Sequence, residues 1–331
     1  MADLFLPQAV ARNAADAGDA VALQHVDGRA MSWSELHDRG LRWASALERL
    51  GAAPGEPVVT IFPMGFEAAL SWLGCAALGA VEAPINSSYK GTWLTHPITL
   101  TGARHLLLDA RFLDAVVEIA DTVPHLERIV VFDGDGRSLP ELPCPVMTGE
   151  AFLDGAEAIA RPGPRPWDLA ALIFTSGTTG PSKAVMVPWR QLDCLMNADI
   201  GYERGAEVQY APFPPYHITG KGPVYSAAEQ CGRVVMREVF STSEYWRDVR
   251  EHGCTAAVIL GPMAQFLLSQ PESPDDADNP LQHVLMAPVI PEVDAFCARF
   301  GVEVHTVFNM TEISSPVTSA ERRVTGDNHR S

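Results

Sequence analysis

The sequence contains little lysine and little positive charge. It has three lysines, Lys90, Lys183 and Lys221. Lysine and arginine together number 24, against 41 aspartates and glutamates, so the net charge is −17. Such an excess of negative charge disfavours binding to nucleic acid or to an anionic membrane. A polyphosphate ligand would therefore need a locally positive pocket.

Cysteine is also sparse, and several familiar motifs are missing. The six cysteines show no spacing typical of a metal site or a redox motif, so we expect reduced cysteines in a cytoplasmic protein. The ten histidines show no zinc-ligand spacing, and there is no Gly-x-Ser-x-Gly elbow of a serine hydrolase. The N-terminus does not resemble a secretory signal, and the longest apolar run, residues 68–81, is too short to span a membrane.

Apolar residues make up 47% of the 331 residues, which is enough for a large core. From residue 56 onward, short β-branched runs alternate with segments of helical length, and this predicts an α/β fold with parallel sheets covered by helices. A stiff Pro-rich connector at 161–166 predicts a first α/β subdomain at 1–160 and a second at 167–331. Predicted strands cover residues 57–62, 81–85, 105–108, 129–132, 169–174, 233–239, 255–260, 283–286 and 302–308, and predicted helices cover 36–50, 66–78, 243–252, 263–269 and 292–300. Ser32, with Glu35 three residues on, predicts a capping box at the start of the first of these helices.

The most informative motif is Phe-Thr-Ser-Gly-Thr-Thr-Gly-Pro-Ser-Lys at residues 174–183. It follows a predicted buried strand and combines two glycines, five hydroxyl side chains and a terminal lysine. Glycines let backbone N–H groups surround an anion, hydroxyls donate further hydrogen bonds, and the lysine adds a charge. The alternative is an ordinary polar turn. The spacing is not that of a Walker loop, so the motif predicts a nucleotide triphosphate site outside the P-loop class.

Two later segments carry further candidate groups. Phe308 to Glu312 follows a predicted strand, and there Phe308 could stack on a base, Thr311 could contact the α-phosphate and Glu312 could bind Mg²⁺. The alternative is a helix N-cap with a first-turn acid. His217 follows a Pro-Pro turn, and Lys221, four residues on, is a candidate partner for an anionic substrate group; a satisfied surface or core histidine is the alternative.

These segments resemble, in type and order, the adenylate-forming (AMP-binding) superfamily of acyl- and aryl-CoA ligases, luciferases and peptide-synthetase adenylation domains, and are nearest to the carnitine/crotonobetaine-CoA ligase-like group. Residues 175–183 resemble its phosphate signature, and 308–312 resemble its aromatic-Gly-x-Thr-Glu motif, with Asn309 in place of glycine. Residues 285–288 lie where the family contacts adenine, with Leu285 and Met286 in place of glycines; strand-end packing is the alternative. The resemblance implies catalytic roles for Thr311, Glu312 and His217, a Mg²⁺ site at Glu312, and nucleotide binding by Thr175, Ser176, Gly177, Thr178, Thr179, Gly180, Lys183, Ala287, Pro288, Phe308 and Asn309.

The resemblance also implies a fold and a reaction. The fold is the large N-terminal domain of the family, with two αβαβα-type layers and a small β-subdomain. Family members continue to a C-terminal domain with a catalytic lysine, whereas this chain ends 19 residues after Glu312, so we expect a truncated chain that binds nucleotide better than it turns over. The oligomeric state is not predicted.

Three functions are compatible with the motifs. In the first, ATP and a carboxylic acid form an acyl adenylate that is passed to CoA. In the second, another acceptor or a small oxyanion such as nitrite takes part, as in amide synthetases and diazotases; the altered residues Leu285, Met286 and Asn309 and the cation of Lys221 fit this option. In the third, the chain is a nucleotide-binding module without catalysis.

Overall fold

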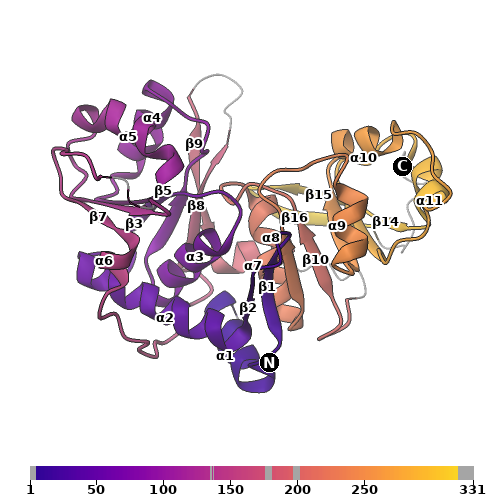
Figure 1. The fold of residues 1–331 in the computed structure, drawn as a ribbon, viewed down its shortest axis with the longest axis horizontal. Coiled ribbons are helices and arrows are strands. Elements are labelled where there is room, and N and C mark those ends of the chain that lie inside the picture. The colour runs from indigo at the N-terminus through magenta and orange to yellow at the C-terminus, as the bar shows by residue number, and fades with distance from the viewer. Residues whose placement is uncertain (1–4, 135, 137, 176–180, 197–201, 320–331) are drawn as a thin grey trace.

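The chain folds into two seven-stranded sheets covered by helices, with a separate two-stranded hairpin (Figure 1). The computed structural model describes residues 5–134, 136, 138–175, 181–196 and 202–319. The predicted α/β class is confirmed. Within the described parts of the chain, no helix is long and apolar enough to cross a membrane.

The first sheet has the order β7-β6-β5-β3-β4-β8-β9, and all its neighbours are parallel except β8 and β9. Its strands are β3 (Pro57–Ile61), β4 (Val81–Pro84), β5 (His105–Asp109), β6 (Arg128–Phe132), β7 (Val146–Thr148), β8 (Leu169–Thr175) and β9 (Lys183–Pro188). The helices between these strands, together with the one that precedes them, are α2 (Trp33–Leu50), α3 (Phe66–Leu78), α4 (Thr92–Thr101), α5 (Leu113–Ile119) and α6 (Gly149–Leu153). The predicted capping box of α2 is present, because the Ser32 side chain accepts from the Glu35 N–H and the Glu35 carboxylate accepts from the Ser32 N–H.

The second sheet has the order β14-β13-β12-β10-β11-β1-β2, parallel from β14 to β1. Its strands are β1 (Val21–His25), β2 (Ala30–Ser32), β10 (Val208–Ala211), β11 (Arg233–Met236), β12 (Ala256–Ile259), β13 (His283–Met286) and β14 (Glu303–His305). The remaining helices are α1 (Leu6–Ala17), α7 (Trp189–Met196), α8 (Ile218–Gln230), α9 (Tyr245–Glu251), α10 (Gly261–Leu268) and α11 (Val293–Phe300). The hairpin consists of β15 (Val307–Met310) and β16 (Ser314–Thr318).

The sheets do not coincide with the expected subdomains at 1–160 and 167–331. β1 and β2 join the second sheet, while β8 and β9 join the first. β1 pairs with β11, which lies between β1 and β10, and Figure 1 shows the indigo strands β1 and β2 in the same part of the molecule as the salmon β10 and α8. The connector at 161–166 therefore does not separate the sheets, because strand pairing between distant segments decides which sheet each strand joins.

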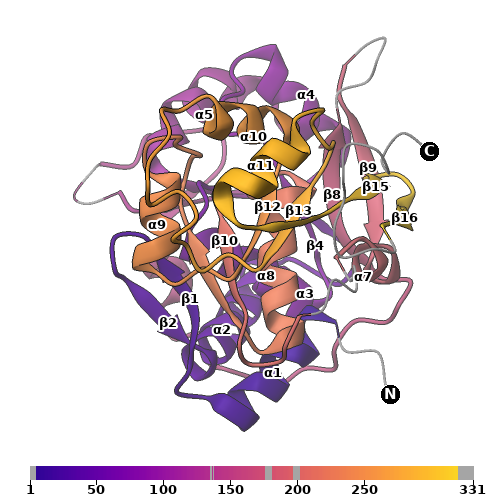
Figure 2. The same ribbon diagram turned by 90° about the vertical axis from the view of Figure 1, so that its right-hand side faces the viewer.

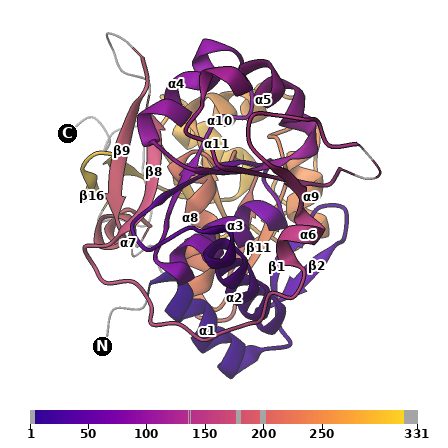
Figure 3. The same ribbon diagram turned by 90° about the vertical axis from the view of Figure 1, so that its left-hand side faces the viewer.

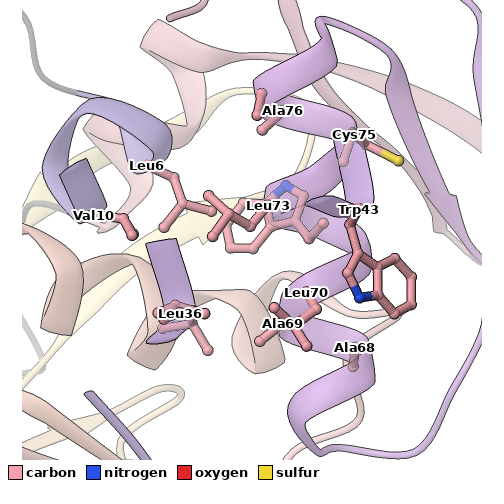
Figure 4. Packing of buried hydrophobic residues seen from close by; sticks show 14 of the residues in the cluster. Leu6, Val10, Leu36, Trp43, Ala68, Ala69, Leu70, Leu73, Cys75 and Ala76 are labelled. Carbon is pink, nitrogen blue, oxygen red and sulfur yellow. The ribbon is translucent and has the colours of Figure 1, made fainter. Parts of the chain in front are cut away.

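One apolar core runs from the N-terminal helices into both sheets. Leu6 and Val10 of α1 face Leu73 of α3 in the interior, with Leu36 of α2 close by (Figure 4). A Cβ on Gly40 of α2 would lie 2.4 Å from the Leu73 side chain, so glycine there allows α2 and α3 to pack closely. This shared core holds the two sheets together around the site.

Buried histidine makes stability depend on pH. His105 is 1% exposed, and burial is the main cause that lowers the pKa of His105. The unfolded chain then binds more protons than the folded one near pH 6. The contribution of His105 to the free energy of unfolding is therefore fully present above the unfolded pKa of about 6.5, and it falls below that pH by up to about 1.4 kcal/mol per pH unit for one group. We expect His105→Phe to reduce this slope in urea unfolding measured between pH 7.5 and pH 5.5. A slope identical to that of the wild type would contradict this assignment.

Candidate active site

The candidate site lies where strands of the second sheet end and the hairpin begins. β10, β12 and β13 are parallel neighbours, so their carboxyl ends lie at one edge, which is where open α/β sheets place their ligands. The chain leaves β10 toward His217 and leaves β13 into the cis bond between Ala287 and Pro288. Figure 2 shows β15 and β16 next to β8, β9 and α7, at the side of this edge.

The start of the phosphate motif and Glu312 are brought together. Thr175 is the last residue of β8, and its hydroxyl donates a hydrogen bond to the Glu312 carboxylate, with 3.3 Å between Oγ1 and Oε1. These residues lie 137 positions apart in the sequence. Glu312 is exposed, so its carboxylate can accept a cation from solvent. Residues 176–180, the centre of the motif, lie outside the described residues.

The far end of the motif is fixed to α4. Lys183 is the first residue of β9, pairs in register with Thr175 and has an exposed side chain. The backbone carbonyl of the buried Ser182 lies 2.9 Å from Nε2 of His96 in α4. The backbone at Lys183 is therefore held beside the end of β8 that carries Thr175.

Thr311 lies in the turn between β15 and β16, not at a helix start, so the alternative interpretation as a helix N-cap was wrong for this segment. The amide of Gln191 in α7 donates to the Thr311 carbonyl at 2.6 Å. The hydroxyl of Ser314, a residue with φ of 72°, donates to the Gln191 carbonyl at 3.2 Å. α7 therefore positions the turn that carries Thr311 and Glu312 (Figure 3).

The residues expected to contact the adenine base lie on neighbouring segments. Phe308 is 58% exposed and Asn309 is also exposed, both on β15. Pro288 is exposed, and Ala287 is half-buried. The hydroxyl of Thr306, just before β15, donates to the Met286 carbonyl at 2.7 Å, so the turn after β13 is tied to the strand that carries Phe308.

His217 caps the N-terminus of α8. Its Nδ1 accepts a hydrogen bond from the Thr219 N–H at 3.2 Å, and the Thr219 hydroxyl lies 2.8 Å from the same nitrogen. His217 is exposed to solvent, yet partial desolvation by the surrounding protein lowers the pKa of His217. The ring is therefore neutral at pH 7, and since Nδ1 accepts, its proton is on Nε2.

Lys221 does not face a cleft, so its expected role as partner of a substrate anion was wrong. It is 3% exposed and forms an ion pair with the 2% exposed Glu82 of β4. Its ammonium lies 4.3 Å from the ring centroid of Trp72 in α3. A buried ammonium needs a partner inside the protein, and the carboxylate that supplies it is 139 residues away in the sequence.

Met286 replaces a glycine of the family at the expected adenine contact, but its side chain lies in the core. Its side chain is fully buried, whereas Leu285 is half-buried, because successive strand residues point to opposite faces. Only the backbone of Met286 takes part near the site, through its contact with Thr306.

Sequence reasoning missed the residues that hold the site in place. Gln191 makes two hydrogen bonds that involve backbone carbonyls, and His96 contacts the backbone carbonyl of Ser182. Such contacts leave no spacing in a sequence. α8 was also missed, because Gly220, Gly222 and Pro223 are poor helix residues. No sequence signal identified Gln191 in particular.

The described residues near Glu312 offer too few ligands to bind Mg²⁺ without a phosphate group. Among the residues that the structure describes, no group of three or more His, Cys, Asp and Glu side chains could hold a metal ion. Glu312 offers a hard oxygen ligand, and Mg²⁺ is commonly bound by one or two carboxylates together with substrate phosphates and water. Glu312 can therefore supply one ligand to a magnesium–nucleotide complex.

Comparison with known proteins identifies the family of the chain and several of its relatives. The chain matches the AMP-binding enzyme family over residues 10–331. It is 30% identical to the sulfoacetate–CoA ligase of Cupriavidus necator, covering 88% of this chain and 56% of that protein. It is 28% identical to the medium/long-chain-fatty-acid–CoA ligase FadD6 of Mycobacterium tuberculosis, covering 87% of this chain and 47% of that protein. The chain thus spans about half the length of these relatives.

Solved structures share the fold. The N-terminal domain of FACL13 from Mycobacterium tuberculosis, bound to an inhibitor, has a TM-score of 0.76 at 18% identity and covers 94% of this chain and 77% of its own. The anthranilate CoA ligase AuaEII, in complex with anthranoyl-AMP, has a TM-score of 0.82 at 19% identity and covers 94% of this chain and 61% of its own. The match over almost the whole chain identifies it as a member of the AMP-binding enzyme family, with the N-terminal domain fold of adenylate-forming enzymes.

Proposed function

We propose that the protein containing this chain uses ATP to activate a carboxylic acid as an acyl adenylate, releases pyrophosphate, and transfers the acyl group to CoA. The observation that carries the proposal is the contact between Thr175, at the start of the phosphate motif, and Glu312, at the end of the Thr-Glu motif. The membership of the family and the relatives that are acid–CoA ligases support it. We place the reaction in the cytoplasm, which the six free cysteines support.

Each group has one role in the proposed reaction. A carboxylate oxygen of the acid attacks the α-phosphorus of ATP, and the bond from that phosphorus to the bridging oxygen breaks as pyrophosphate leaves. Residues 175–183 hold the β- and γ-phosphates, with Lys183 supplying positive charge, and the Thr311 hydroxyl donates to the α-phosphate. Glu312 holds Mg²⁺, which when bound offsets phosphate charge.

His217 orients the acid. With its proton on Nε2, the neutral ring can donate a hydrogen bond to the substrate carboxylate without neutralising it. The attacking oxygen therefore remains an anion and a nucleophile.

Two of the observations that favoured the nitrite-activating alternative do not hold in the structure. The cation that fitted a small oxyanion, Lys221, is already paired with Glu82, and Met286 is buried in the core. A carboxylic acid is therefore the substrate class that we propose.

Acid-dependent exchange of labelled pyrophosphate into ATP tests the proposal. The panel is sulfoacetate, fatty acids of two to sixteen carbons and an aryl acid such as anthranilate, with nitrite as a further arm and the His217→Asn variant beside the wild type. We expect exchange with at least one carboxylic acid, reduced in the variant. Exchange with no acid by a folded protein that binds ATP would leave the chain as a nucleotide-binding module and overturn the proposal.

Removal of the exposed aromatic ring of β15 is expected to weaken nucleotide binding. Stacking of a base on an aromatic side chain contributes about 1–3 kcal/mol, so Phe308→Ala should raise the Kd for AMP about 5- to 150-fold in calorimetric titration. Phe266→Ala is the matched control, because Phe266 of α10 is also 58% exposed but lies on another element. Equal affinity of the two variants would contradict stacking by Phe308.

A further inference from the structure

The first two turns of α8 form a helix only weakly by themselves. They contain Gly220, Gly222 and Pro223, and glycine and proline are the least favourable residues in helices. Pro223 has no N–H to donate to the carbonyl one turn earlier. A Cβ on Gly220 would lie 2.1 Å from the Pro214 carbonyl oxygen, so the first turn packs tightly against the segment before it. Contacts outside the helix must therefore fix where these turns, and His217 at their start, lie.

Lys221 supplies that contact. It lies one turn after His217, and its buried ammonium pairs with Glu82 of β4 beneath the Trp72 ring. The Glu82 carboxylate also accepts a hydrogen bond from Thr60 of β3 at 3.0 Å. The start of α8 is thereby anchored to two strands of the first sheet and to α3 (Figure 3).

An ion pair is an uncommon contact between two buried elements such as α8 and β4. Both charges lose their hydration, so a pair of apolar side chains of similar size is often as stable or more stable. The ion pair constrains where α8 lies, because the Lys221 ammonium must contact the Glu82 carboxylate in a defined geometry. We propose that Lys221 and Glu82 are positioning residues that set the place of His217 in the site; this rests on the role proposed above for His217.

The test is a neutral replacement of the pair. Glu82→Gln combined with Lys221→Met removes both charges while the Gln oxygen can still accept from Thr60. Lys90→Met is the matched control at an exposed lysine. The imidazole signals of His217, assigned by their loss in His217→Asn, are followed by NMR in this chain. The KM values for acid and for ATP are measured by pyrophosphate exchange in the protein that contains this chain.

The double variant is expected to fold, with shifted His217 signals. The KM for the acid should rise about 10- to 100-fold with little change in the KM for ATP, since misplacement of an orienting group has effects of this size. Unchanged His217 signals in the folded double variant would overturn the inference. If that variant does not fold, Lys221→Arg, which keeps the charge but lengthens the side chain, must shift the same signals, and no shift overturns the inference. Absence of exchange by the wild type with every acid would refute the proposed function, while the NMR signals would still decide the positioning role.

Discussion

Replacing Glu312 by glutamine is expected to lower the rate of acid-dependent pyrophosphate exchange by about 10²- to 10³-fold, the usual effect of removing one group that stabilises transition-state charge. The substitution keeps an oxygen that can accept from the Thr175 hydroxyl, so the turn between β15 and β16 should stay in place. What it removes is the negative charge that would bind Mg²⁺. The effect should therefore appear in kcat and in the magnesium dependence, with little change in stability.

The matched control is Glu303→Gln, because Glu303 is an exposed carboxylate of β14 that lies nine residues before Glu312. We expect it to exchange pyrophosphate at the wild-type rate. Equal activity of Glu312→Gln and Glu303→Gln at limiting Mg²⁺ would show that the carboxylate of the Thr-Glu motif does not hold the metal.

Lys221→Met is expected to cause the largest loss of stability among these variants. It leaves the 2% exposed Glu82 carboxylate without its cation, and the loss of one partner from a buried ion pair costs about 3–5 kcal/mol in the free energy of unfolding. Urea unfolding at pH 7.5 measures the effect. Addition of Glu82→Gln should restore most of the loss, because no uncompensated charge then remains in the core.

Lys90→Met serves as the surface control, with an expected change within about 0.5 kcal/mol. If Lys221→Met were as stable as this control, the buried pair described between α8 and β4 would not exist in solution. If the double variant were no more stable than the single one, the loss would come from packing of the lysine stem and not from charge.

The sequence was sufficient to predict the fold class and most elements, because their signals are local. The capping box at Ser32 and Glu35 and the strand at His283–Met286 were predicted from residue types alone and are present. The predicted strand at 302–308 is divided between β14 and β15, which belong to different sheets. The assignment of β1 and β8 to their sheets depends on pairing between strands that are far apart in the chain. No local pattern in a single sequence indicates such pairing.

Part of the candidate site was also predictable. Glu312 and Thr175 were recognised as motif residues, and the structure brings them into contact. The environment of Lys221 was not predictable, since its partner is contributed by another sheet. The charge of a lysine is evident from sequence, whereas its burial is a property of the assembled fold.

The most direct test of acyl-adenylate formation follows an oxygen atom. An acid carrying ¹⁸O in its carboxylate is incubated with ATP, Mg²⁺, CoA and the protein that contains this chain, and the products are analysed by mass spectrometry. Since the carboxylate oxygen that attacks the α-phosphorus stays on it when the acyl group is transferred to CoA, we predict one ¹⁸O in AMP and none in pyrophosphate. Label in inorganic phosphate with formation of ADP, or AMP without label, would contradict the account.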